Sequence, residues 1–153
     1  MTNNRSNTSK YPATLLLPAD AFDTQNYQLM GRRVAGKEFA LGIVKNLTQG
    51  EELNILVYSE KEKEELNKIL YPFLSHKSSL KIHTDINKLN LNELENLHIP
   101  GPDIEKWSAI RANYSPNKFS ITGIIHTLCS NTVINGFKEY IFGGLESWDA
   151  LVC

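Results

Sequence analysis

The sequence predicts an α/β protein with a Rossmann-like, doubly wound sheet of about six mostly parallel strands and helices on both faces. One observation is that strand and helix patterns alternate along the chain, which favours βαβ units with right-handed crossovers. The other is that the strands beginning near Ala13, Leu53 and Ser120 are almost entirely apolar. Strands buried on both faces of a parallel sheet have this composition.

The first elements are a strand, a helix and a second strand. The run Ala13–Pro18 (ATLLLP) is the first predicted strand, and Pro18 ends it because proline cannot donate to a sheet ladder. A helix is predicted over Gly31–Leu47, and the strand Leu53–Tyr58 (LNILVY) follows it. The side chains expected on the inner face of this helix are Ala35, Phe39, Gly42, Ile43 and Leu47.

A capping box predicts where the next helix begins. Ser59 occupies the cap position and Glu62 follows three residues later. The third predicted strand is Leu80–Thr84, in which polar and apolar residues alternate. The next segment, Ile86–Glu95, is expected to be a short polar helix or loop. The amphipathic face of the helix after Ser59 is expected to contain Leu66, Ile69, Leu70, Phe73 and Leu74.

Three strands and two helices complete the predicted order. The strands are Asn96–Ile99, Ser120–His126 and Asp149–Cys153. Asp103 is expected to cap the first helix, and Ser130 or Asn131 the second. The side chains expected to face inward are Ile104, Trp107 and Tyr114 in the first helix and Val133, Phe137, Ile141 and Leu145 in the second.

Composition limits the classes of protein that fit. The chain has 153 residues, a formal net charge of −1 and a hydrophobic content of 41%. These values suit one globular domain and give no electrostatic footprint for nucleic acid or an anionic membrane. We expect a disordered polar tail over residues 1–12, one domain over residues 13–153 and no membrane-spanning segment. Two cysteines without paired spacing suit a reducing compartment, so we expect a cytoplasmic protein.

Several common site motifs are absent from the sequence. The glycines do not form the dinucleotide fingerprint G-x-G-x-x-G, and there is no P-loop motif. The histidines and cysteines lack the spacing of metal ligands, so no metal site is expected. His98 lies inside a predicted strand, and we interpret it as structural.

The candidate site residues lie after the predicted strands, where open parallel sheets bind ligands. His126 ends the fifth strand, where its imidazole can donate to a sugar hydroxyl or a carbonyl; the alternative is a buried core histidine. Gly31 begins a helix whose amides favour anions, and Arg32 and Arg33 add positive charge; the alternative is two solvated arginines. Gly101, between two prolines, forms either a pocket edge or simply a stiff turn.

Three segments resemble the N-terminal domain of retaining glycosyltransferases of the GT-B class, family 4 or "group 1": Phe119–Ser130, Gly31–Gly36 and Trp148–Cys153. In that family the first loop carries a glycine near an Ala-Gly helix start, and the fifth strand ends in a histidine, commonly followed by threonine or aspartate. His126-Thr127 matches the second pattern. The resemblance covers residues 13–153, but Arg32 and Arg33 stand where the family more often has glycine.

The resemblance implies the acceptor-side half of a hexosyltransferase that moves a sugar from a nucleotide sugar to an acceptor, without a metal or other cofactor. A C-terminal domain or partner chain would bind the nucleotide sugar, so we expect little activity from these residues alone. His126 would be catalytic by contacting the transferred sugar. The residues implied to bind substrate are Gly31, Arg32, Arg33, Gly101 and Thr127. The alternative is a stand-alone Rossmann-like or flavodoxin-like binding domain that acts through a protein partner.

Overall fold

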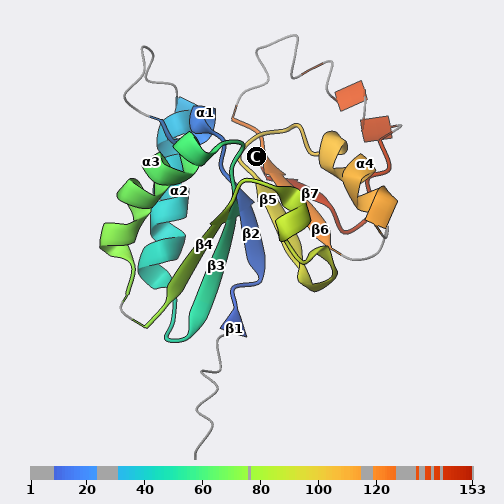
Figure 1. Ribbon diagram of the computed structural model, residues 1–153. Helices are drawn as coiled ribbons and strands as arrows, with labels where there is room; N and C mark the ends of the chain where they lie inside the picture. Colours follow the sequence, from blue (N-terminus) through green and yellow to red (C-terminus); the bar gives the residue numbers. More distant parts are fainter. Residues whose placement is uncertain are drawn as a thin grey trace, which may run out of the picture.

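The computed structural model describes residues 9–23, 31–75, 77–114, 119–126, 134, 137, 138, 140, 141 and 143–152. Within these residues the strands form one sheet in which every pairing is parallel (Figure 1). The strands are β1 (Ser9–Lys10), β2 (Ala13–Leu16), β3 (Glu51–Leu56), β4 (Ser79–His83), β5 (Asn96–Ile99), β6 (Ser120–Ile124) and β7 (Ala150–Val152). The predicted fold class is confirmed.

The short strands β1 and β2 act as one interrupted strand, because both pair with β3. Strand β4 pairs with the other side of β3, and β5, β6 and β7 continue beyond β2. The spatial order is therefore the doubly wound order 3-2-1-4-5-6, which differs from the flavodoxin-like order 2-1-3-4-5. Its topological switch point lies between β2 and β5.

Part of the predicted polar tail belongs to the sheet. Ser9 and Lys10 pair with Glu51 and Glu52, and the Tyr11 amide donates to the Glu52 carbonyl over 2.9 Å. The prediction of a disordered tail through residue 12 is therefore wrong for residues 9–12; residues 1–8 lie outside the described part of the chain. The reason is that β3 offers an edge that a polar segment can pair with through its backbone alone.

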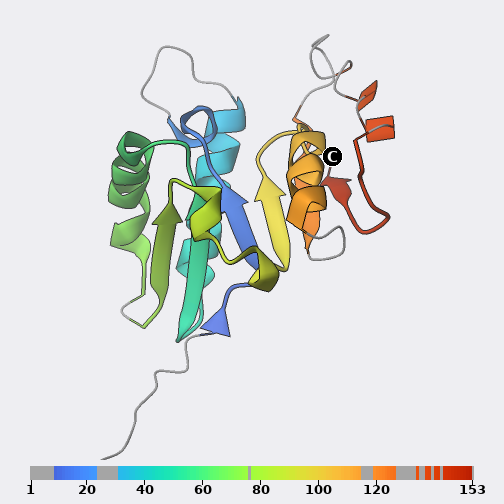
Figure 2. The same cartoon turned by 45° about the vertical axis from the view of Figure 1, so that its right-hand side comes forward.

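Helices cover both faces of the sheet (Figure 2). Two consecutive leucines of β2 show this, since Leu15 packs in one core cluster and Leu16 in the other. The first cluster includes residues of α2 and α3, and the second includes Trp107 of α4 and leucines beside η2 and η3. The bounds are α1 (Ala19–Phe22), α2 (Gly31–Asn46), α3 (Glu60–Leu70), η1 (Tyr71–Phe73), η2 (Ile86–Lys88), η3 (Leu91–Glu93) and α4 (Glu105–Tyr114).

Helix α2 presents to the core only part of the face that its sequence predicts, namely Ile43 and, just after the helix, Leu47. Phe39 is 41% exposed and Ala35 is also exposed, whereas Ala40 and Val44 are buried. A Cβ atom on Gly36 would lie 2.2 Å from the Ala21 carbonyl oxygen, so this glycine lets α1 approach α2. Close contact between the helices therefore selects the stripe that starts at Gly36.

Other local predictions have mixed outcomes. The Ser59 cap is confirmed, since its hydroxyl accepts from the Glu62 amide over 3.2 Å. Ile104 rather than Asp103 precedes α4, and its carbonyl accepts from the helix amides. Tyr114 and Ile141 were expected inside but are 50% and 78% exposed. Val133 of the last predicted helix lies outside the described residues.

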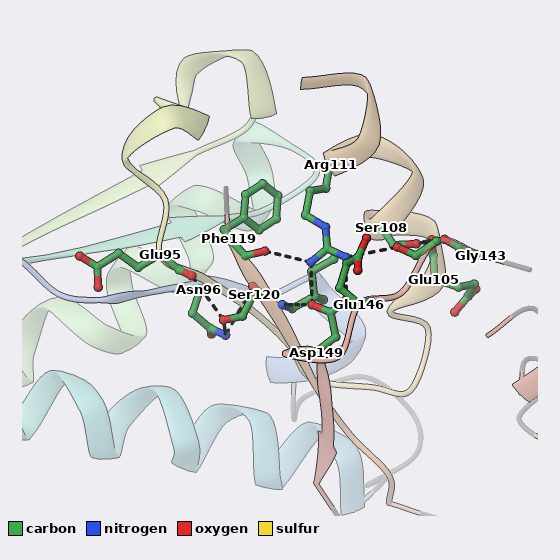
Figure 3. A network of polar contacts seen from close by, with 12 residues as sticks. Glu95, Asn96, Glu105, Ser108, Arg111, Phe119, Ser120, Gly143, Glu146 and Asp149 are labelled. Carbon is green, nitrogen blue, oxygen red and sulfur yellow. Dashed lines mark hydrogen bonds and ion pairs between the residues drawn. The ribbon is translucent and has the colours of Figure 1, made fainter. Parts of the chain in front are cut away.

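A buried ion pair fixes the amino ends of β6 and β7 to α4 (Figure 3). Arg111 and Asp149 make two parallel hydrogen bonds of 2.6 Å, with side chains only 1% and 3% exposed. The guanidinium also donates to the carbonyls of Phe119 and Gly144, and the carboxylate accepts from the amides of Ile121 and Glu146. Each charge is therefore solvated by protein groups, as burial requires.

Candidate functional site

The crevice expected in a doubly wound sheet lies at the carboxyl ends of β2 and β5, where the chain leaves the sheet in opposite directions. Helix α2 begins at this edge with Gly31, which is exposed and would have no atom within 4 Å of an added Cβ. Arg33 is partly buried in the first turn of α2, and the backbone of Arg32 belongs to the same turn. The first turn contains no acidic residue, so its amides face no carboxylate of their own turn.

The end of β2 is closed by a glutamate from α3. Glu62 accepts from the Ala19 amide over 2.8 Å with one carboxylate oxygen and from the Tyr58 amide over 2.7 Å with the other. These bonds join the start of α1 to the loop after β3. The Ala19 amide at the start of α1 therefore already has a carboxylate partner.

Gly101 forms the wall that follows β5. It is buried, and its carbonyl accepts from the Ile124 amide over 3.2 Å. A Cβ atom on Gly123 would lie 2.6 Å from the same carbonyl oxygen, so a glycine in β6 lets the turn approach. Of the two sequence interpretations of Gly101, a stiff turn is thus realised, and it follows the carboxyl end of β5.

Tyr140 holds this turn from outside. Its hydroxyl donates to the Pro102 carbonyl. Burial, together with the charges of Glu105 and Asp103, raises the pKa of Tyr140 to about 12. The phenol therefore stays protonated, and the hydrogen bond persists throughout the neutral range.

His126 lies two residues beyond the end of β6 and is exposed. The preceding residue is anchored, because the Ile125 amide donates to the Val152 carbonyl over 2.8 Å. The structure thus brings His126 to the same sheet edge as Gly31 and Gly101, and the alternative of a buried core histidine is wrong. Thr127 lies outside the described residues.

His98 is buried, as expected for a residue inside a strand, but its hydrogen bonding is incomplete. Thr122 donates its hydroxyl to Asn96 Oδ1 over 3.2 Å, so this hydroxyl must accept from His98 Nδ1, 3.0 Å away. The neutral ring then carries a lone pair on Nε2, which is buried without a partner among the described residues. Burial lowers the pKa of His98, which keeps the ring neutral.

The structural role predicted for His98 is incomplete, because the prediction did not include the free acceptor at Nε2. The signal was the polar pair Asn96 and His98 on one side of a strand whose other side is apolar. The ring packs against Phe39 of α2, with ring centroids 4.7 Å apart. His98 therefore marks a polar position on the α2 side of the sheet.

Neither a metal-binding cluster nor a membrane-spanning helix is found among the described residues. They contain no group of three or more histidine, cysteine, aspartate or glutamate side chains suited to a metal ion. None of their helices is long and apolar enough to cross a membrane.

Comparison with known proteins gives no relative: no protein-family model, curated protein or solved structure matches the chain. The fold and the edge residues define the class of domain, which is a doubly wound α/β domain with an exposed histidine and the start of α2 at its switch-point edge. The residues at this edge are therefore the basis of the function proposed below.

Proposed function

We propose that the chain is the acceptor-side half of a glycosyltransferase that moves a sugar from a nucleotide sugar to an acceptor. The observation that carries the proposal is the shared edge: Gly31, Gly101 and His126 all follow the carboxyl ends of parallel strands or begin the helix after one. The resemblance of the sequence around Gly31 and His126 to GT-B enzymes supports the same function. A C-terminal domain or partner chain would supply the nucleotide-sugar site.

The chemistry asked of these residues is positioning and electrostatic stabilisation. In retaining transfer the leaving diphosphate gains charge, and the first turn of α2 at Gly31, which has no acidic residue, favours an anion. Arg33 in the same turn adds a positive charge. His126, exposed at the edge, can donate a hydrogen bond to the transferred sugar. These groups substitute for a metal ion, so we propose metal-independent transfer in the cytoplasm.

The test is sugar transfer by the complete gene product from radiolabelled UDP-, GDP- and ADP-hexoses. His126→Ala should lower turnover roughly 10²-fold or more, the scale for losing one well-placed transition-state donor, with an unchanged melting temperature. The control is Thr48→Val, because Thr48 is exposed and lies just before the amino end of β3, at the opposite end of the sheet. A chelator should leave the rate unchanged. No transfer from any donor, or equal rates for wild type and His126→Ala, would reject the proposal.

A binding domain that acts through a protein partner is the second candidate, and exposed apolar side chains favour it. Val152 is 54% exposed and Phe39 is 41% exposed. Strand register puts Val152 beside Ile124 on the side of the sheet that contains His98. Substituting Val152→Lys should then abolish co-purification of the partner without changing the melting temperature.

A further inference from the structure

A polar hollow of about 140 Å³ lies on the side of the sheet opposite α2 and α3, beside η2 and η3. This volume accommodates a small molecule rather than a single water. Covered faces of parallel sheets are normally apolar, so a polar floor departs from this rule. The floor residues come from three adjacent strands and are Thr14, Glu52, Asn54, Lys81 and His83.

The charges around the hollow cancel. Glu52, whose side chain is 10% exposed, accepts from Lys81 over 2.7 Å. Lys10 pairs with Glu93, which joins β1 to η3. The remaining charged lining residues, Lys88 and Glu95, have opposite signs. Three lysines thus face three glutamates, and the hollow offers no net charge to select an anion or a cation.

His83 adds no charge at neutral pH. Burial and the positive charge of Lys81 lower its pKa, although Glu52 acts in the opposite direction. Its Nε2 lies 2.9 Å from Asn54 Oδ1. An amide oxygen only accepts, so His83 donates from Nε2 and the amide nitrogen of Asn54 is left for another partner.

The unpaired groups on the floor are neutral. The Thr14 hydroxyl and the Asn54 amide nitrogen have no hydrogen-bond partner among the described residues. Thr14 is only 4% exposed, so ordinary solvation is limited there. Leu89 and Leu94, both 8% exposed, add an apolar wall. Hydroxyl and amide groups beside an apolar wall match a molecule with several hydroxyls and a C–H face.

We propose that this hollow binds a neutral polyhydroxylated molecule of the size of one sugar ring, with Thr14 and Asn54 contacting its hydroxyls. The hollow lies on the face of the sheet opposite α2, whereas the proposed transfer site lies at the carboxyl edge beside the start of α2. The two proposals are therefore independent.

The test is an NMR titration of the ¹⁵N-labelled protein with glucose, N-acetylglucosamine and myo-inositol, with glycine and inorganic phosphate as charged probes. At least one neutral probe should shift the amide signals of Thr14 and Asn54 with a Kd of roughly 1–10 mM, the range for a ligand held by a few hydrogen bonds. Shifts from glycine or phosphate alone would overturn the proposal. So would the absence of shifts at about 50 mM of every neutral probe.

Matched variants test whether the neutral probe binds in the hollow. Thr14→Val keeps the side-chain shape, removes one hydroxyl, and should weaken binding about 3- to 10-fold, as should Asn54→Ala. Thr48→Val is the control because Thr48 is exposed and does not line the hollow. His126→Ala should leave this binding unchanged even if it abolishes transfer. Unchanged affinity in both Thr14→Val and Asn54→Ala would overturn the proposal, and the dispersion of the spectra reports whether each variant is folded.

Discussion

The two ends of β6 and β7 are held in place by different kinds of contact. At the amino ends, Arg111 and Asp149 are buried and satisfy each other, together with nearby backbone groups. At the carboxyl ends, the backbone of Gly101 packs closely on Gly123, and His126 is exposed. Charge is therefore concentrated at the closed end, whereas the open end has a ligand-accessible side chain. The charged groups at the closed end are thus satisfied within the protein, whereas the histidine at the open end is exposed to solvent.

The largest expected effect comes from breaking the ion pair. Arg111→Met should destabilise the protein by about 3–5 kcal/mol, because it leaves the Asp149 carboxylate buried without its cation. Urea unfolding at neutral pH measures the change. Lys61→Met is the control, since Lys61 is exposed in a 3.9 Å pair with Glu65 and should stay within about 0.5 kcal/mol of wild type.

A double substitution sharpens this prediction. Arg111→Met with Asp149→Leu removes both charges and should recover part of the loss seen in Arg111→Met. A double variant as unstable as the sum of its parts would mean that the pair acts through packing alone and not through its charges.

A smaller effect is expected at the open end. Gly123→Ala should cost about 1–3 kcal/mol, because the new Cβ would lie 2.5 Å from Ile104 Cγ2 and 2.6 Å from the Gly101 carbonyl oxygen. Gly42→Ala has no atom within 4 Å of its Cβ and lies inside α2, so it should stabilise by about 0.5–1 kcal/mol. Thermal unfolding compares the two. Equal melting temperatures would contradict close packing at Gly123.

Acid should weaken the closed end selectively. Burial opposes the charge on Asp149, but hydrogen bonds from Arg111 and from the amides of Glu146 and Ile121 prevail and hold its pKa below the ordinary value. Stability from this group is therefore complete above the unfolded pKa of about 3.9 and is lost as pH falls through the folded pKa. Unfolding free energies between pH 7 and pH 2 should fall less steeply for Asp149→Asn than for wild type. Parallel curves would assign the acid sensitivity to other carboxylates.

Local signals in the sequence predicted most elements. Strand β5 has the predicted bounds, and the Ser59 cap forms as expected. The predicted face of α2 was wrong at Ala35 and Phe39, because apolar and small residues surround much of this helix, and contact with α1 at Gly36 decides its rotation. The Arg111–Asp149 pair joins residues 38 apart, a separation that no local pattern reports.

The candidate site was likewise predictable where local patterns determine it and not where distant residues meet. The positions of Gly31, Gly101 and His126 at one edge follow from strand and helix alternation alone. The polar floor of the hollow was missed because the strand around Asn54 was interpreted as apolar on both sides. A floor built from three strands becomes visible only when their register is known.

The all-parallel pairing also determines the order in which the strands can pair while the chain is synthesised. Strand β2 lies between β3 and β5, and β5 begins only at Asn96. On the ribosome, β2, β3 and β4 emerge with their helices well before the second neighbour of β2 exists. One edge of β2 therefore stays unpaired until β5 has been synthesised. A delay in translation between Thr84 and Asn96 would lengthen the time during which this edge can pair with another chain and aggregate.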